Sequence, residues 1–452
     1  MKNPLRLTPI LLLAAFLAGC QGPCEKLGPI NVVAPALTSG TADFTSFASV
    51  GTSISTGYQS SGIVDRHQVN AFPAIFARQV GKTVQLDGKG TFSEPTVNGN
   101  GSPALLQLRS VSPLVISNAG LTDGTPDNTL FPRAYSNMAV PGSILYDFAN
   151  TTRYGSSAAF ALVTRGLGSI RNQVLSLNPT FLSFEYGANE VLGPATSGVS
   201  TQSPATNPFA YAAFLTQAMD SVHTYAPAAK LALFNVPNVT AIPFCTTFKP
   251  YTVMLADGTP TTLVGPDGPL ALTDLVLLTA QDSLAIGTGF PVGSYNYLNP
   301  TAPGNGRPLA DYQVLNTSET ASLTADISAM NAAVDSVATR PWIVEVDLNS
   351  LLTSLAANGI TIGGTQYTTA YVQGGLFSLD GVHPTDLGHA IIANTMIAAV
   401  NARFGSTIAP VNPLAYATAT ASSARPALPG KLSLEGMRMD GLRQGLKNLF
   451  GR

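Results

Sequence analysis

The sequence predicts an α/β protein, with about five parallel strands in a sheet covered by helices on both faces, a three-layer α/β/α arrangement. Short apolar runs rich in aromatic and β-branched residues alternate with longer segments whose apolar residues recur every three or four positions. The 452 residues include 42 glycines and 33 prolines, so loops are plentiful. The 45% apolar content excludes a disordered chain.

Five short segments are candidate strands, and helical patterns separate them, which favours parallel pairing. They are FTSFASV (44–50), AYSNMAV (134–140), TFLSFEY (180–186), LALFNV (231–236) and WIVEVDL (342–348). The first is followed by a predicted helix over AFPAIFARQV (71–80). A final helix is expected to begin near Pro384 and Thr385.

Two further helices are predicted from apolar spacing. One lies between the second and third strands, and its apolar face comprises Phe160, Val163, Leu167, Ile170, Val174 and Leu177. The other precedes the last strand, and its apolar face comprises Leu323, Ile327, Met330, Val334 and Val337. Ser318 is the expected N-cap of this second helix.

Two turn-rich insertions interrupt the alternation, at about 84–130 and 246–315. The first is expected to hold a hairpin within LLQLRSVSPLVIS (105–117). The second is expected to hold a hairpin that turns at Asp257-Gly258. Insertions of this length are usually functional loops or disorder.

The N-terminal segment has the features of a targeting signal. Lys2 and Arg6 precede an apolar run that is too short to span a bilayer. The run ends in Leu17-Ala18-Gly19-Cys20, which resembles a bacterial lipobox. This resemblance implies a signal peptide over 1–19, lipidation of Cys20, and a tether over 20–42. The alternative is an ordinary secretory signal with an unrelated cysteine.

The residue after Cys20 is Gln21 rather than Asp, which by the lipoprotein sorting pattern favours the outer membrane of a bacterial cell envelope. Export also permits a disulfide. Cys24 and Cys245 are therefore expected either to pair or to remain as two free thiols.

The composition changes again after about residue 410. Residues 410–452 are expected to form a flexible tail with a short basic amphipathic helix. Its apolar face comprises Leu442, Leu446, Leu449 and Phe450. The alternatives for this helix are that it lies on a membrane surface, that it docks on its own domain, or that it is frayed.

Charge and histidine content narrow the function. Lys and Arg total 23 and Asp and Glu total 25, so a nucleic-acid partner is not indicated. There are four histidines, with no HExxH motif and no Cys/His cluster of zinc spacing, so no metal or organic cofactor is expected. His67 and His223 have no acidic partner at a suggestive spacing, and His389 is expected to be structural.

The segment FSLDGVHPTDLGH (377–389) carries the remaining histidine. Asp380 and His383 are three residues apart, just before a predicted helix, so the carboxylate can orient one imidazole nitrogen while the other accepts a proton. Ser53 follows the first strand in ASVGTSISTGY (48–58). Loops at the carboxyl ends of parallel strands converge, so Ser53 and His383 are expected to meet.

These residues resemble the SGNH, or GDSL-type, hydrolase family over about residues 44–405, within a predicted domain at 43–409. Four blocks of the family occur in order. They are ASVGTSISTGY, YSNMAVPGSIL, FEYGANEVLG and LDGVHPTDLGH. The resemblance implies a flavodoxin-like fold and a carboxylic ester hydrolase (esterase or lipase).

The resemblance also implies residue roles. Ser53, Asp380 and His383 would form the catalytic triad. Ser53, Gly142 and Asn189 would form the oxyanion hole that stabilises the tetrahedral intermediate. Asn189 and Gly142 have an alternative interpretation as turn residues that stabilise their own loops.

Two positions depart from the family pattern. Thr52 replaces the aspartate before the nucleophile, and Glu190 replaces the aspartate of the third block. Both are expected to hold the catalytic residues in position without taking part in the reaction. Glu185 is also unusual, because it falls in a strand that should be buried.

Three functions therefore remain in view. The first is hydrolysis of a small-molecule or lipid ester, at a membrane reached through the lipid anchor. The second is a non-catalytic lipid- or glycan-binding lipoprotein on the same fold, and the third is a polysaccharide O-deacetylase. The 246–315 insertion, rich in Tyr, Leu and Val, is expected either to wall an acyl pocket or to cover the sheet edge.

Overall fold

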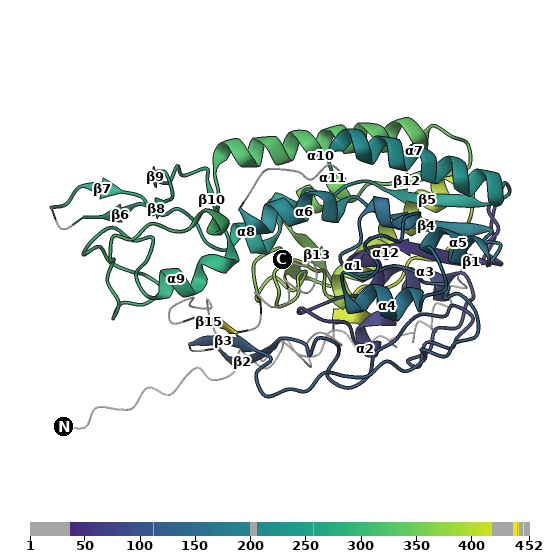
Figure 1. Ribbon diagram of the computed structural model, residues 1–452, viewed down its shortest axis with the longest axis horizontal. Coiled ribbons are helices and arrows are strands. Elements are labelled where there is room, and N and C mark those ends of the chain that lie inside the picture. Colours follow the sequence, from purple (N-terminus) through teal and green to yellow (C-terminus); the bar gives the residue numbers. More distant parts are fainter. Residues whose placement is uncertain are drawn as a thin grey trace, which may run out of the picture. The chain divides into compact units, whose positions relative to one another are not determined.

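A mixed α/β fold with a parallel sheet is seen in the computed structural model (Figure 1). The structure describes residues 37–111, 113–198, 206–255, 257–417 and 437–440, together with 442 and 446. The predicted signal peptide, Cys20 and Cys24 lie outside the described residues. Among the described residues, no helix is both long enough and apolar enough to cross a membrane.

The central sheet has four parallel strands in the order β1-β4-β5-β12. They are β1 (Phe47–Gly51), β4 (Phe181–Glu185), β5 (Lys230–Phe234) and β12 (Ile343–Val346). All four coincide with predicted strands, and the parallel pairing is confirmed. The register places Gly51 beside Glu185, so the carboxyl ends of β1 and β4 lie together.

The predicted strand at 134–140 forms a single parallel bridge, between Asn137 and Ser49, rather than a full strand. Its backbone still follows β1, because Met138 N–H donates to Ser49 and Val140 N–H to Gly51. The N–H of Asn137 turns away and donates to Ser93 in the first insertion. The segment is therefore shared between the sheet and that insertion.

Helices cover both faces of this sheet. Successive strand residues point to opposite sides, and in these strands the residues on both sides are mostly apolar and buried. One face packs against α5 (Ile170–Leu175), α7 (Pro208–Tyr225) and α10 (Thr317–Ala338). The other face packs against α3 (Phe72–Gln79) and α12 (Asp386–Phe404). Both α3 and α12 agree with the predicted helices.

Two predictions about helices are wrong. The single helix expected around 160–177 is two helices, α4 (Ala158–Thr164) and α5. Gly166 and Gly168 between them have φ values of 71° and 102°, which a helix cannot continue through, and Leu167 is exposed. Helix α10 is capped by Asn316 rather than by Ser318, in a capping box with Glu319.

Both predicted hairpins are present. The first pairs β2 (Gln107–Val111) with β3 (Leu114–Ser117), and the second pairs β6 (Val253–Met254) with β7 (Pro260–Thr261). The second insertion also contains β8 (Val264–Gly265), β9 (Gly268–Pro269), β10 (Leu275–Val276), β11 (Val314–Leu315), η3 (Leu278–Ala280), α9 (Gln281–Ala285) and η4 (Asp311–Gln313). It extends beyond the carboxyl ends of the strands (Figure 1).

Smaller elements complete the described chain. They are α1 (Ser53–Thr56), α2 (Asp65–Gln68), η1 (Leu145–Phe148), α6 (Ala188–Ser197), η2 (Val239–Ala241), α8 (Pro243–Thr246), α11 (Leu348–Asn358), β13 (Ile360–Ile362) and β14 (Thr365–Tyr367). Of these, α1, α6 and α11 follow strands of the central sheet directly, at the edge where the site is built.

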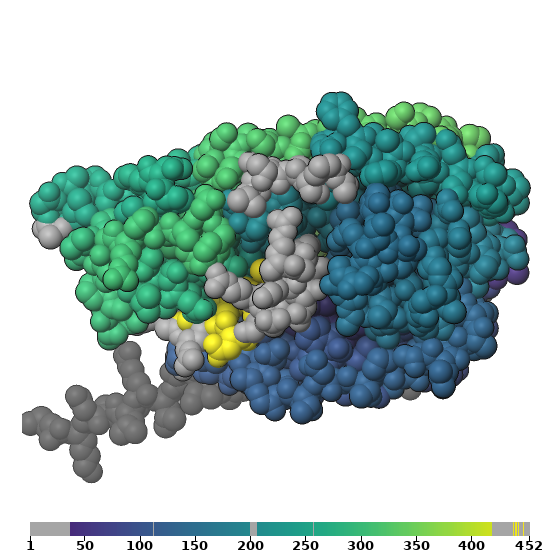
Figure 2. Space-filling view, viewed as in Figure 1, coloured from purple at the N-terminus to yellow at the C-terminus, as the bar shows by residue number. Residues whose placement is uncertain are grey.

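Within the predicted tail, the structure has a strand that the sequence analysis did not expect. β15 (Arg438–Asp440) pairs in parallel with β3, and Met437, Met439 and Leu442 are buried. These C-terminal residues, yellow in Figure 2, lie between the first and second insertions. Leu446 is partly buried, whereas Leu449 and Phe450 lie outside the described residues. The described residues of this stretch, 437–440, 442 and 446, therefore dock on the rest of the domain.

Candidate active site

The hydroxyl of Ser53, the imidazole of His383 and the carboxyl of Asp380 form a continuous chain of hydrogen bonds. Ser53 Oγ lies 2.9 Å from His383 Nε2, and His383 Nδ1 lies 2.9 Å from Asp380 Oδ2. All three residues are at most 2% exposed. The structure thus brings together the three residues that the sequence analysis selected from segments more than 300 positions apart.

Asp380 is held by four donors besides the imidazole. Its Oδ1 accepts the backbone N–H groups of Val382 and His383 and the hydroxyl of Ser378, and its Oδ2 accepts the N–H of Ser61. Burial acts to raise the pKa of Asp380, but the His383 charge and these hydrogen bonds outweigh it and leave the pKa below its ordinary value.

An ionised Asp380 accepts a hydrogen bond from Nδ1–H of His383, and in the neutral imidazole Nε2 then carries a lone pair that faces the Ser53 hydroxyl. The ring of Tyr58 packs on the same imidazole, with 4.6 Å between ring centroids. The imidazole is therefore held in position by a hydrogen bond at Nδ1 and by contact with the Tyr58 ring, which is tilted by 49° relative to it. This is the arrangement that a general base needs.

Ser53 begins α1 directly after β1, so its position depends on a tight strand-to-helix turn. Thr52 caps the short helix, and Gly57 ends it with φ at 73°. The carbonyl of Ser53 accepts the N–H of Tyr58 at 3.1 Å and the hydroxyl of Thr56 at 2.8 Å. These bonds hold the serine at the carboxyl end of the sheet.

Glu185 contacts this turn through several hydrogen bonds that the sequence did not reveal. The N–H and the hydroxyl of Thr52 and the hydroxyl of Ser55 all donate to its carboxylate. Burial raises the pKa of Glu185 to about 7, although these hydrogen bonds act in the opposite direction. The one available signal was an acidic residue in a strand expected to be buried.

Gly142 lies in a turn attached to the same end of β1. It has φ at 79°, a conformation that favours glycine. On either side of it, the N–H of Val140 and the hydroxyl of Ser143 both donate to the carbonyl of Gly51. The turn is therefore fixed two residues before Ser53.

Asn189 lies in the first turn of α6 and lines the same pocket as Ser53 and His383. One N–H of its amide donates to the carbonyl of Ser143 at 2.7 Å, and the second has no partner among the described residues. The helix N-terminus contributes positive potential at this point. An amide with one free N–H is suited to stabilise a developing oxyanion.

Glu190 supports the turn that holds Gly142. Its Oε1 accepts the N–H of Leu145 at 2.7 Å, and burial raises its pKa to about 7. This bond ties the third block of the sequence to the second, as expected for a supporting residue.

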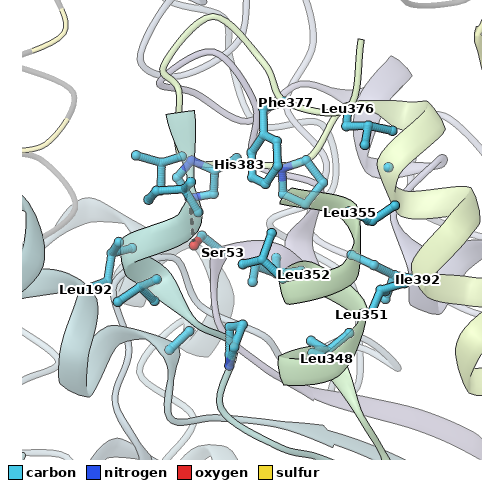
Figure 3. Close-up of a pocket in the computed structure, with 18 of the residues that line it drawn as sticks. Ser53, Leu192, Leu348, Leu351, Leu352, Leu355, Leu376, Phe377, His383 and Ile392 are labelled. Carbon is cyan, nitrogen blue, oxygen red and sulfur yellow. Dashed lines mark hydrogen bonds between the residues drawn. The ribbon is translucent and has the colours of Figure 1, made fainter. Parts of the chain in front are cut away.

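A deep pocket opens beside Ser53, with an empty volume of about 780 Å³ that includes solvent at its mouth. Its polar side chains are those of Ser53, Asn189 and His383, and the other lining residues are apolar or glycine. Leucines from α11 lie across the pocket from Ser53 and His383 (Figure 3). No described residue of the 246–315 insertion lines it, so the first of the two alternatives for this insertion, a wall of the acyl pocket, does not apply to this pocket.

The other histidines have structural surroundings. His67 Nδ1 lies 2.8 Å from Asp386 Oδ1, an acidic partner 319 positions away that no local spacing indicates. His223 stacks on Trp342 with 5.0 Å between ring centroids. His389 is fully buried, and burial lowers its pKa to about 4, which keeps it neutral.

Among the described residues, no group of His, Cys, Asp and Glu is placed to hold a metal ion. Cys245 is buried and pairs with no cysteine of the described part of the chain, and burial raises the pKa of its thiol to about 12. Cys24 lies outside those residues, so its pairing with Cys245 stays a prediction.

Comparison of the chain with protein-family models and with curated proteins gives no match. The arrangement of Ser53, His383 and Asp380 beside an apolar pocket is therefore the basis on which a function is argued.

Proposed function

We propose that this protein is a carboxylic ester hydrolase that acts through a Ser-His-Asp triad and an acyl-enzyme intermediate. One observation carries the proposal: the unbroken chain from Ser53 Oγ through His383 to Asp380, with 2.9 Å at each link. A buried, aligned set of this kind is what a serine needs to become a nucleophile at neutral pH.

The mechanism follows from the positions of these groups. His383 Nε2 takes the proton of Ser53 as Oγ attacks the ester carbonyl carbon, and Asp380 stabilises the imidazolium that forms. The free N–H of Asn189 and the backbone N–H groups of Ser53 and Gly142 are assigned to the resulting oxyanion. His383 then protonates the departing alcohol.

The second half of the reaction uses the same residues. The acyl group stays on Ser53 Oγ as an ester, and a water molecule gives its proton to His383 as it attacks the acyl carbon. Collapse of the second tetrahedral intermediate returns the proton to Ser53 and releases the carboxylic acid.

We assign the chain to the SGNH hydrolases as part of the same proposal. The strand order, with residues 134–140 bridged to the outer side of β1, supports a flavodoxin-like sheet in which the second segment precedes the first. Helices on both faces support the three-layer arrangement. The departures at Thr52 and Glu190 leave the catalytic groups in place.

The pocket favours an ester with an aliphatic part over a polysaccharide O-acetyl group. Sugar hydroxyls need hydrogen-bonding partners, and the lining supplies three polar side chains, all of them near the reacting centre. A binding protein without catalysis shares the pocket but has no need for the aligned triad. Attachment to an outer membrane through Cys20 stays part of the proposal and is supported by the sequence alone.

Hydrolysis of nitrophenyl butyrate by the wild type and by Ser53→Ala tests the proposal. We expect turnover by the wild type and a loss of roughly 10³-fold or more in kcat for the variant. Thr353→Ala, at an exposed position of α11 away from the pocket, is the matched control and should retain activity. A folded wild type without turnover would favour the binding function.

A further inference from the structure

Helix α11 presents a stripe of leucines to the pocket. Leu348, Leu351, Leu352 and Leu355 recur at spacings of three and four, which places them on one helical face. All four line the pocket, and Figure 3 shows them across from Ser53 and His383. Thr353, Ser354 and Ala356 on the same helix are exposed. Leu351 and Leu355 are only partly buried, so they offer apolar surface that the fold itself leaves uncovered.

The remaining walls of the pocket are apolar as well. Leu192 comes from α6, Val239 and Ile242 follow β5, and Phe377 and Ile392 come from the segment around His383. Apolar side chains that line an open pocket gain free energy when an apolar ligand covers them.

We propose, on the basis of the hydrolase function above, that the leucine stripe of α11 is the acyl-chain wall of this enzyme. The preferred substrate is an ester of an unbranched aliphatic acid longer than acetate. The chain is assigned to the acyl side because the acyl group stays bonded to Ser53 Oγ between the two steps, at the wall of the pocket. The alcohol leaves before the second step and needs no apolar site.

A series of nitrophenyl esters from acetate to octanoate measures the effect of the acyl chain. Each methylene that enters the pocket should raise kcat/KM by about fourfold, which corresponds to about 0.8 kcal/mol. The gain should appear mainly in KM, because the chain binds equally in the ground state and the transition state. A series of n-alkyl acetates, which lengthens the alcohol instead, should show a much smaller gain.

Variants of the stripe locate the effect. Leu355→Trp fills the pocket at a partly buried position, so we expect it to fold and to lose the preference for octanoate over acetate. Leu352→Phe is a second variant with the same expectation. Ala356→Trp places the same ring at an exposed position of α11 and should keep the wild-type profile.

The results separate this inference from the proposed function. If the wild type hydrolyses no ester of either series, the hydrolase function itself is contradicted. If it hydrolyses nitrophenyl acetate but shows no acyl-chain preference, the acyl-chain wall is contradicted and the hydrolase function stands. A preference that Leu355→Trp and Leu352→Phe both leave unchanged also contradicts the wall.

The hydrogen bonds of Glu185 support a second inference, which does not depend on the leucine stripe. Its Oε2 lies 3.0 Å from the N–H of Thr52 and 2.9 Å from the hydroxyls of Thr52 and Ser55. Among the described residues, no Lys or Arg forms an ion pair with this carboxylate. Its hydrogen bonds therefore converge on the residues that flank Ser53.

The carboxylate of Glu185 occupies space that a side chain at position 51 would fill. A Cβ at Gly51 would lie 2.5 Å from Ser55 Oγ and 2.8 Å from Glu185 Oε2, so any other residue there would displace the contact. Residue 51 is also the partner of Glu185 in the β1–β4 register. The absence of a side chain at Gly51 therefore leaves the space in which the Glu185 carboxylate reaches the nucleophile turn.

We infer that Glu185 is a positioning residue that holds the nucleophile turn, and that it supplies from β4 the carboxylate that Thr52 does not provide. This inference also rests on the proposed function. It predicts that the carboxylate can be moved between the two positions.

The test uses Glu185→Gln, Thr52→Asp and the double variant, assayed with a short-chain ester. Glu185→Gln should lower kcat by about 10- to 100-fold with little change in KM, because Ser53 loses its alignment. Thr52→Asp should also be impaired, because two carboxylates then share one buried site. The double variant restores a single carboxylate and should regain activity to within several-fold of the wild type.

Glu345→Gln on β12 is the matched control, since this carboxyl bonds Asn235 rather than the nucleophile turn, and it should retain full kcat. Thermal melts establish that each variant is folded. A folded Glu185→Gln with wild-type kcat would contradict the inference, as would a double variant no better than the poorer single variant. Absence of turnover in the wild type would instead contradict the hydrolase function.

Discussion

The hydroxyl of Ser53 lies 2.9 Å from Nε2 of His383, although 330 positions separate the two residues in the sequence. The fold accounts for this meeting. β1 delivers Ser53 to the carboxyl edge of the sheet, and the segment before α12 returns His383 to the same edge. The consequences for activity and stability can each be measured.

Replacement of Asp380 by Asn should lower kcat by roughly 10³- to 10⁴-fold, because an amide no longer holds the proton on Nδ1 of His383. KM should change little, since Asp380 is not among the residues that line the pocket. Steady-state kinetics with a short-chain ester measure both quantities. A kcat within tenfold of the wild type would show that the carboxylate does not set the tautomer.

Asn189→Ala should lower kcat by about 10²- to 10³-fold through loss of an oxyanion donor. The change also frees the carbonyl of Ser143, which accepts the other N–H of this amide. A thermal melt therefore accompanies the kinetics. If Asn189 acts solely as a turn amide, the melting temperature will fall while kcat per folded molecule stays unchanged.

The buried carboxyl of Glu94 predicts a pH dependence of stability. Burial raises its pKa to about 8, so the folded protein keeps this proton at pH values where the unfolded chain has released it. The free energy of unfolding should therefore fall as the pH rises from 5 to about 8. The side chain of Glu94→Gln is neutral at both pH values. Its free energy of unfolding should therefore fall by at least about 1 kcal/mol less than that of the wild type over the same pH range. Urea unfolding of both proteins at the two pH values provides the comparison, and equal losses would contradict it.

Because β15 packs on the rest of the domain, shortening the buried side chain of Met439 should destabilise the folded protein. This side chain is 7% exposed, and its sulfur lies 3.4 Å from the hydroxyl of Tyr371. Met439→Ala should lower the free energy of unfolding by about 2 kcal/mol. Met254→Ala, at an exposed methionine of β6, should change it by less than about 0.5 kcal/mol. Equal effects of the two variants in chemical unfolding would show that β15 adds no stability.

Local patterns were enough to predict much of this molecule. The strands of the central sheet follow from short apolar runs, and Asp380 and His383 follow from a three-residue spacing in a tight turn before a capped helix. Ser53 could be selected because a strand ends just before it, and parallel strands bring their carboxyl ends together.

The features that the sequence did not predict have physical causes of two kinds. Within 160–177 the apolar spacing continued through two glycines with positive φ, so periodicity indicated one helix where the backbone makes two. Other features depend on contacts between distant residues. His67 meets Asp386 across 319 positions, and Glu185 meets Thr52 across 133, so no local spacing could reveal either pair.

That α11 lines the pocket could not be predicted for a related reason. The leucines of α11 are readable as an apolar helical face, but which element they face is decided by how β12 and α12 place that helix. The Tyr, Leu and Val content of the 246–315 insertion was compatible with a pocket wall and with a cover for the sheet edge, and it did not decide between them. Composition alone does not locate a segment relative to the active site.

Covalent labelling with a fluorophosphonate, followed by mass spectrometry of the modified peptide, tests directly whether Ser53 is the nucleophile. We expect one adduct, on Ser53, in the wild type and none in Ser53→Ala. Labelling should also slow strongly in Asp380→Asn, because His383 then fails to activate the serine. An unlabelled wild type, or an adduct on a different residue that persists in Ser53→Ala, would show that Ser53 is not the nucleophile.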